Sequence, residues 1–289
     1  MKEMQMYNAK KMNKPLMLSL ALAMSAIVAG CGGSSGGGGG GSSITNPGSA
    51  CSGTGCVNLG TAGNYVILDE ATITYTPAAS VSSTVKITGN VGISPNQAGS
   101  IEGFALNLPA ASSFSTSTLV SGKIYAPGYA APTPAELTAA IADKNTAYTA
   151  AAGMATAGGG LAGGTPGTAC PGNGALGGLT LTPGVYTCAV NVSIGTGTAL
   201  TLSGAGVYVI KTTGNLTQAV ATSVNLTNGA LPENVYWQVA GYASILANAH
   251  MEGVIISASY IALGDSASVK GRLLARTGVT MITNTVTQP

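Results

Sequence analysis

The C-terminal part of the chain alternates apolar and polar positions and repeats this pattern every 18 residues. Segment 235–252 aligns with 253–270 and then with 271–288. Alternation with a period of two is typical of β-strands that bury one face. The apolar parity, which we expect to point inward, contains Trp237/Ile255/Leu273, Ala243/Ile261/Val279, Ile245/Leu263/Met281 and Met251/Val269/Thr287. The opposite parity is small and mostly polar, and we expect it to point outward: Ser244/Ala262/Thr280, Asn248/Ser266/Asn284 and His250/Ser268/Val286.

A repeat of this length predicts a β-solenoid. Eighteen residues accommodate about three short strands with tight corners, and each turn can then hydrogen-bond to the next. Segments 179–189, 200–211 and 216–226 show the same alternation, less regularly, with Gly, Asn or Pro at the corners. The repeat therefore predicts a mainly β, triangular solenoid.

One outward column of this solenoid is apolar and needs a cover. It contains Gln238/Ile256/Leu274, with Val254 beside it. The cover that we expect is a helix over about 134–152, which opens with Thr133-Pro134-Ala135-Glu136, a capping box with proline in the first turn. An apolar stripe at helical spacing would pack on the solenoid: Leu137, Ile141, Lys144, Tyr148 and Ala151.

The first 30 residues have the pattern of an export signal. A basic start precedes the apolar segment 16–28, which at about 1.5 Å per residue is shorter than the ~30 Å core of a bilayer. Ala29-Gly30-Cys31 resembles a bacterial lipobox, so we expect Cys31 to be lipidated and to anchor the protein at the outer membrane or cell surface. If the lipobox is not used, we expect a secreted protein. Residues 31–50 contain a Gly/Ser-rich stretch and are expected to be a flexible tether, followed by one domain over 51–289.

Charge is sparse once this leader is set aside. Seven basic and eight acidic residues follow residue 30. Nucleic-acid binding requires clustered Lys and Arg, so this composition argues against it. Four cysteines lie in the expected domain and allow three pairings; short spacing favours Cys51 with Cys56 and Cys170 with Cys188. With a single histidine in the chain we expect no metal site, and we expect no cofactor.

Seven collinear segments resemble the ice-binding proteins of cold-adapted microbes. They are VNLGTAGNYVIL (57–68), ITGNVGISP (87–95), VSGKIYAPGYAAPTP (120–134), LTLTPGVYTC (179–188), PENVYWQVAG (232–241), HMEGVIIS (250–257) and GRLLARTGVTM (271–281). The resemblance implies a discontinuous right-handed β-solenoid with one long helix along one face, in which N-terminal strands stack beside the last C-terminal turn. It also implies that a flat, uncovered face contacts ice, in an antifreeze protein that causes thermal hysteresis and inhibits recrystallisation.

Two uncovered faces are candidates for that contact. We favour the face that carries the Ser244 column, because Thr277-Gly278-Val279-Thr280 fits the family pattern Thr-Ala/Gly-X-Thr/Asn. Its expected contact residues are Thr213, Asn215, Thr217, Tyr242, Ser244, Tyr260, Ala262, Gly278 and Thr280. The alternative face offers Asn248, Ser266, Ser268 and Asn284.

Two other functions remain open from the residues alone. The domain could be an adhesin-like module that binds a glycan or another surface, because a fold does not determine a function. A polysaccharide-active enzyme is disfavoured because the acidic residues are scattered. Asp69-Glu70, the one adjacent acidic pair, is interpreted as a solvated turn, and His250 as a surface strand residue. The expected partners are ice and, through the lipid, a membrane, for a monomeric protein.

Overall fold

The computed structural model describes residues 56–77, 86–160 and 169–289. These residues belong to one unit, Ile44–Pro289. The expected leader, the lipidation site Cys31, the tether 31–50 and Cys51 lie outside the described residues. Within the described ranges, no helix is long and apolar enough to cross a membrane.

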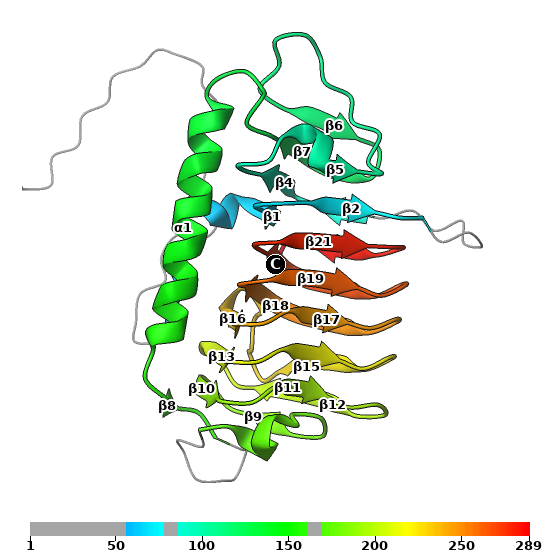
Figure 1. Cartoon of the computed structure of the whole chain (residues 1–289). Coiled ribbons are helices and arrows are strands. Elements are labelled where there is room, and N and C mark those ends of the chain that lie inside the picture. Colours follow the sequence, from blue (N-terminus) through cyan, green and yellow to red (C-terminus); the bar gives the residue numbers. More distant parts are fainter. Residues whose placement is uncertain (1–55, 78–85, 161–168) are drawn as a thin grey trace, which may run out of the picture. The chain divides into compact units, whose positions relative to one another are not determined.

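The described chain winds into a β-solenoid with three faces, as the repeat predicts (Figure 1). Residues of the expected inward parity fill its interior, where Trp237, Ile255 and Leu273 are at most 1% exposed. The ladder pairs these three residues in one column, since Trp237 pairs with Ile255 and Ile255 with Leu273. The predicted β-solenoid fold with one helix is confirmed.

The strands form two hydrogen-bonded sheets, of which the smaller makes one face. This seven-stranded face consists, in spatial order, of β11 (Val192–Ile194), β14 (Leu216–Gln218), β17 (Ala243–Ile245), β19 (Tyr260–Leu263), β21 (Gly278–Met281), β2 (Ile73–Tyr75) and β5 (Ile101–Glu102). All its neighbouring strands are parallel.

The larger sheet bends around the other two faces. The face covered by the helix contains β8 (Ala157–Gly158), β10 (Gly184–Cys188), β13 (Tyr208–Thr212), β16 (Val235–Val239), β1 (Tyr65–Asp69), β4 (Asn90–Ile93) and the second halves of β18 (His250–Ser257), β20 (Ser268–Leu274) and β7 (Val120–Tyr125). The third face contains β9 (Thr180–Leu181), β12 (Ala199–Ser203), β15 (Ser223–Thr227), β22 (Thr285–Thr287), β3 (Lys86–Thr88) and the first halves of β18, β20 and β7, with β6 (Ser115–Ser117) antiparallel to β7.

Glycine permits the bend inside β18 and β20. Gly253 and Gly271 are paired across the two strands. Gly253 has φ +103°, and a Cβ on Gly271 would lie 1.7 Å from the carbonyl oxygen of Gly253. A side chain cannot be accommodated at these positions. Because both residues are glycine, each strand can turn from the third face to the helix-covered face without a loop.

The chain order along the solenoid is discontinuous. β1, β2 and β3 pair with β20, β21 and β22, the strands of the last C-terminal turn. Figure 1 shows β2 directly above β21, with β19 and β17 below it. The first described strands therefore lie beside the last C-terminal turn, and the chain then passes through β4 and β7 and runs along the helix to the other end of the solenoid.

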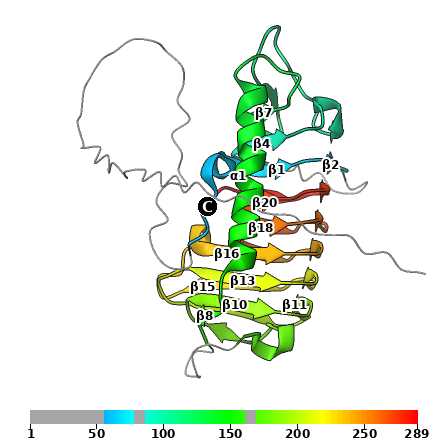
Figure 2. The same cartoon turned by 60° about the vertical axis from the view of Figure 1, so that its left-hand side comes forward.

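Helix α1 (Thr133–Gly153) covers the apolar outward column, as expected (Figure 2). Val254, Ile256 and Leu274 are buried in one cluster with helix residues that include Leu137 and Ala147. The buried stripe runs through Leu137, Ala140, Lys144, Ala147 and Ala151, while the expected Ile141 and Tyr148 are only partly buried. Three residues of this stripe are alanines, whose small side chains let the helix approach the sheet closely.

The predicted capping box is wrong. The helix shows no side-chain hydrogen bond at its N-cap, which is Pro132. The hydroxyl of Thr133 instead donates to the carbonyl oxygen of Ser113. Tertiary contact with the preceding loop thus takes the group that the sequence pattern assigns to the cap.

Asp69 and Glu70 do not form a solvated turn, contrary to the interpretation from sequence. Asp69 is fully buried, and its carboxylate accepts the N–H groups of Ala71 and Thr72, both at 2.7 Å. Burial raises the pKa of the Asp69 carboxyl, against these hydrogen bonds and the nearby charge of Lys144. The carboxylate shapes the corner between β1 and β2.

Lys144 joins the helix to this corner. Its ammonium donates to Glu70 Oε1 at 2.7 Å and to the carbonyl oxygen of Ala275 at 2.6 Å, and the side chain is 2% exposed. Burial lowers the pKa of Lys144, and Glu70 opposes this shift. The apolar stripe of the helix therefore contains one paired charge.

The 18-residue repeat fails at the last corner. Ser268 pairs with Thr285 and Val269 with Val286, so the expected columns Ser268/Val286 and Val269/Thr287 are wrong by one residue. The corner between Met281 and Thr285 is one residue shorter than the corner between Leu263 and Ser268. The shift lets Val286 point inward, where it is fully buried.

One predicted disulfide is confirmed. Cys170 and Cys188 are bonded across 18 residues, at the end of the solenoid opposite β5. Cys56 is also disulfide-bonded, whereas Cys51 lies outside the described residues.

We expect Lys144→Ala to destabilise the fold by about 2–4 kcal/mol, because it leaves Glu70 without its cation and the buried Ala275 carbonyl without its donor. Urea unfolding followed by circular dichroism measures this free energy. Asn145→Ala is the control, because Asn145 is exposed on the same helix and should change stability by no more than about 0.5 kcal/mol. Equal effects of the two changes would contradict the role assigned to Lys144.

Replacing both Cys170 and Cys188 with Ala should lower the free energy of unfolding by about 3 kcal/mol, because the unfolded chain gains the entropy of an open loop. Thermal unfolding under identical buffer conditions checks this. A variant that unfolds at the temperature of the unmodified protein would show that this end of the solenoid is held without the bond.

Candidate functional site

The seven-stranded face presents one continuous column of small side chains. In each three-residue segment of these strands, the first and third side chains point into the solenoid and the middle side chain points outward. The burial of β17 illustrates this, since Ala243 and Ile245 are buried and Ser244 is only partly buried. The pairing register places the middle residues side by side across the strands. This central column consists of Ser193, Thr217, Ser244, Ala262, Thr280, Thr74 and Glu102.

The column is long, regular and almost uncharged. Neighbouring parallel strands are about 4.8 Å apart, so the six small residues from Ser193 to Thr74 extend over roughly 24 Å. Among the described residues of the column only Glu102, at one end, carries a charge. Figure 1 shows β17, β19, β21 and β2 stacked in this order. The backbone ladder therefore holds hydroxyl and methyl groups in a repeating row on a rigid support.

The sequence located the centre of this column and missed its ends. Thr217, Ser244, Ala262 and Thr280 are brought together as expected. Ser193 and Thr74 were missed, because their strands lie outside the regular 18-residue repeat. The alternation in Ile73-Thr74-Tyr75 and the expected docking of N-terminal strands on the last turn were the signals that could have identified Thr74.

A second column lies along the margin of the face, next to the corner that leads from the helix-covered face. Tyr260 pairs with Gly278, and extending the register of the other strands by one position completes this margin column: Thr72, Gly278, Tyr260, Tyr242, Asn215 and Asn191. It brings together the expected Asn215, Tyr242, Tyr260 and Gly278, and the sequence missed Asn191 and Thr72.

The two asparagines of the margin column brace the backbone. Asn191 Oδ1 accepts the N–H of Asn215 at 2.9 Å, and Asn215 Oδ1 accepts the N–H of Tyr242 at 3.1 Å. Each amide oxygen is therefore turned toward the next turn of the solenoid. The expected ice contact Asn215 lies on the seven-stranded face, and its amide oxygen accepts a backbone hydrogen bond.

The tyrosines of the margin column stack on each other. The ring centroids of Tyr242 and Tyr260 are 5.0 Å apart, and the ring planes differ by 7°. Thr213, by contrast, lies in the turn between β13 and β14, where its N–H donates to the Cys188 carbonyl oxygen. Thr213 therefore belongs to neither column of the face.

A family comparison agrees with this geometry. The family model described as Ice-binding-like matches residues 67–287. The chain belongs to this family. It is 35% identical to an ice-binding protein of Flammulina populicola over 241 residues, which is 83% of this chain and 92% of the relative. It is 36% identical to an ice-binding protein of a Colwellia species over 244 residues, or 82% and 86% of the two chains.

Solved structures of ice-binding proteins share the fold. An Arctic yeast ice-binding protein, LeIBP, matches with a TM-score of 0.72 and 35% identity over 81% of this chain and 94% of that chain. A domain of an ice-binding protein from Shewanella frigidimarina matches with a TM-score of 0.65 and 30% identity over 80% and 96%. The family is one of ice-binding proteins and not of enzymes, in agreement with the prediction from sequence.

The alternative ice-binding residues do not form one plane. Asn248 and Ser266 are corner residues, both with φ +57°. Asn284 is fully buried, and its amide nitrogen donates to the carbonyl oxygens of Gly264 and Ala267. Ser268 lies on the third face. The expected outward column through Asn284 is therefore wrong, since the shortened corner turns this side chain inward.

The third face is charged and contains an interacting serine, histidine and glutamate. Ser268 Oγ lies 2.8 Å from His250 Nδ1, and His250 Nε2 lies 3.0 Å from Glu252 Oε1. This order resembles a hydrolytic triad. The N–H groups of His250 and Ser268 nevertheless donate to the neighbouring turns, at Thr222 and Ala249, and so cannot bind an oxyanion. Lys270 pairs with Glu252 across the strands and adds a further charge.

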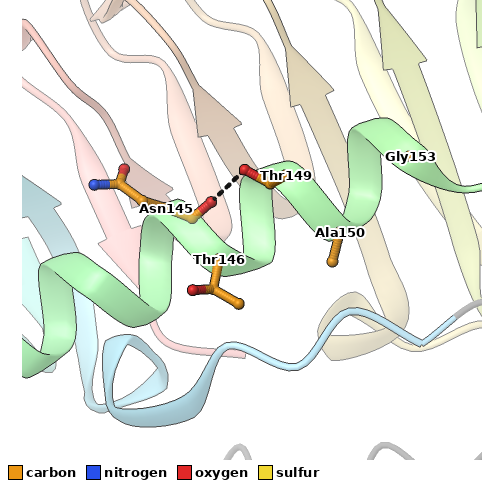
Figure 3. A pocket seen from close by; sticks show the side chains of 5 residues that line it. All are labelled: Asn145, Thr146, Thr149, Ala150 and Gly153. Carbon is orange, nitrogen blue, oxygen red and sulfur yellow. Dashed lines mark hydrogen bonds between the residues drawn. The ribbon is translucent and has the colours of Figure 1, made fainter. Parts of the chain in front are cut away.

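A hollow on α1 has no catalytic character. It has a volume of about 670 Å³ and is lined by Asn145, Thr146, Thr149, Ala150 and Gly153 (Figure 3). In Figure 3 these residues follow one side of the helix, and the Thr149 hydroxyl donates to the Asn145 carbonyl oxygen. None of the five side chains titrates. Over the described residues, no cluster of three or more His, Cys, Asp or Glu could hold a metal ion.

Asn215→Ala should cost about 1 kcal/mol of unfolding free energy, because the N–H of Tyr242 loses its acceptor. Chemical unfolding of the purified domain measures the loss. Asn225→Ala is a suitable control, since Asn225 is exposed on β15 of the third face. If Asn215→Ala were no more destabilising than Asn225→Ala, the bracing role would be wrong.

Proposed function

We propose that this chain binds ice through the seven-stranded face. The observation that carries the proposal is the central column, in which six small residues lie in register on consecutive parallel strands without a large or charged side chain among them. Membership of the ice-binding family and the ice-binding names of its relatives support the same function.

The physical basis is a rigid surface that holds water in place. Backbone hydrogen bonds link every turn, so the spacing of the Thr and Ser hydroxyls along the column is fixed. The methyl groups of Thr280, Thr74 and Ala262 limit the directions in which the neighbouring water can hydrogen-bond. Charged groups, which would bind water in other geometries, lie mostly on the other faces. Many weak contacts then act together along one flat surface.

The third face is a poorer candidate for ice contact. Glu252, Lys270 and Lys86 bring charges to its outward columns. Its water layer is therefore organised by charge, and the seven-stranded face remains the contact surface that the geometry supports.

We further propose that the protein is exported, is lipid-anchored at Cys31 and acts as a monomer at the outer membrane or cell surface. The signal-like leader, the lipobox-like Ala29-Gly30-Cys31 and the Gly/Ser-rich segment support the anchor. Such an anchor would place the domain where ice meets the cell. Incorporation of a labelled fatty acid into the full chain, and its loss in Cys31→Ala, would test the anchor; size-exclusion chromatography with light scattering would test the monomer.

Purified domain, residues 44–289, should be incorporated into a slowly growing ice hemisphere and cause thermal hysteresis. Thr280→Tyr should remove most of the hysteresis, because one bulky ring in the central column holds the face away from a flat crystal surface. Its unfolding temperature should stay nearly unchanged, since Thr280 is exposed.

Thr285→Tyr is the matched control for Thr280→Tyr. Thr285 is also an exposed strand residue of the last turn, but it lies on the third face. It should retain the hysteresis of the unmodified protein. A loss confined to Thr285→Tyr would move the site to the third face, and exclusion of the unmodified domain from ice would favour the adhesin-like alternative.

A further inference from the structure

We propose that Tyr242 and Tyr260 form a ridge that narrows the contact surface of the seven-stranded face and restricts the ice planes that it can bind. This inference rests on the proposed ice-binding function. It assigns the two tyrosines, which the sequence analysis gives only as expected contact residues, a role in specificity.

The two rings stand out from a margin column that is otherwise low. Asn191 and Asn215 turn their amide oxygens into the backbone of the next turn. Gly278 has no side chain, and a Cβ there would lie 3.0 Å from the Thr72 hydroxyl. The tyrosines occupy the two consecutive positions between Asn215 and Gly278. They therefore interrupt a margin whose other described side chains are small or folded against the backbone.

Stacking makes this interruption rigid. The 5.0 Å separation of the ring centroids is close to the spacing of about 4.8 Å between neighbouring strands, so each ring is positioned over its own strand. The rings are nearly parallel, and rotation of either ring about its side-chain bonds would break this stacking contact. Tyr260 is still 39% exposed. A ring pair held in this way is a fixed obstacle rather than a side chain that a crystal surface can push aside.

The ridge affects only one side of the contact surface. The central column, with Ser244 and Ala262 on the same two strands, lies two residues along from Tyr242 and Tyr260. A crystal plane wide enough to cover both columns meets the rings before it meets the small residues. An ice plane that needs contact only along the central column can bind there without contact at the ridge. The tyrosines thereby select among crystal planes while leaving the column itself unchanged.

The test compares two double variants of the purified domain. Tyr242→Thr with Tyr260→Thr removes the ridge and places β-branched residues on the strands, which suit a sheet. Tyr242→Phe with Tyr260→Phe keeps both rings and removes only the hydroxyls. Fluorescently labelled protein on a single-crystal ice hemisphere reports the bound planes, and thermal hysteresis reports the strength of adsorption.

We expect the Thr variant to bind additional ice planes and to show higher hysteresis, and the Phe variant to match the unmodified protein. Lower hysteresis or fewer planes in the Thr variant would show that the rings are themselves contact groups, and unchanged planes and hysteresis would show that they do not limit contact. Either result overturns the ridge. If the Thr double variant is unfolded by circular dichroism, the single change Tyr260→Thr answers the same question with one ring remaining.

Failure of this inference is distinguishable from failure of the proposed function. An unmodified domain that stays in the liquid refutes ice binding as such. An unmodified domain that binds ice, loses binding with Thr280→Tyr and is unaffected by removal of both rings retains the proposed function without the ridge.

Discussion

Register between successive parallel strands is the constraint on which this molecule depends. Each turn hydrogen-bonds to the next, so a side chain lies beside its counterpart in the neighbouring turn. The same ladder aligns Trp237 with Ile255 in the interior and Ser244 with Ala262 on the surface. The core and the central column are therefore two sides of one arrangement. A loss of register would disturb both, because a shift of one residue exchanges inward and outward positions.

The last corner shows how closely this arrangement depends on corner length. The corner between Met281 and Thr285 has one residue fewer than the equivalent corner of the preceding turn, and this changes which residues pair on the third face. The seven-stranded face keeps its register through Thr280. Asn284 adapts to the shorter corner by turning its amide inward. A period read along the sequence assumes equal corners, and it therefore predicts the columns before Met281 correctly and those after it incorrectly.

The sequence was informative where chemistry repeats and uninformative where single contacts decide. Alternation and the 18-residue period identified the solenoid, the covered column and the centre of the candidate site. The roles of Asp69, Glu70 and Lys144 were not predictable in this way, since they meet through elements far apart in the chain. Thr133 shows the same limit, because a local capping pattern competes with a tertiary acceptor that no local pattern reveals.

Several of the few charges of the domain hold the helix-covered side together. Lys144 bonds to Glu70, Arg272 donates two hydrogen bonds to the Gly63 carbonyl oxygen, and Asp143 accepts the N–H and hydroxyl of Thr61. Burial lowers the pKa of Arg272, with Tyr236 and Glu233 opposing this shift. Charge is thus concentrated where long-range segments must be joined. Because these charges lie on the helix-covered side, the seven-stranded face on another side of the solenoid can remain nearly neutral.

The docking of β2 on β21 has a consequence for the way the seven-stranded face is assembled. Thr280 lies close to the end of the chain and Thr74 close to the start of the described domain, yet they are neighbours in one row. During synthesis the row stays incomplete until the final strands have emerged and found the first ones. The longest uninterrupted stretch of the row is therefore a property of the finished molecule, because Thr280 of β21 lies between Ala262 and Thr74 and joins the two parts of the row.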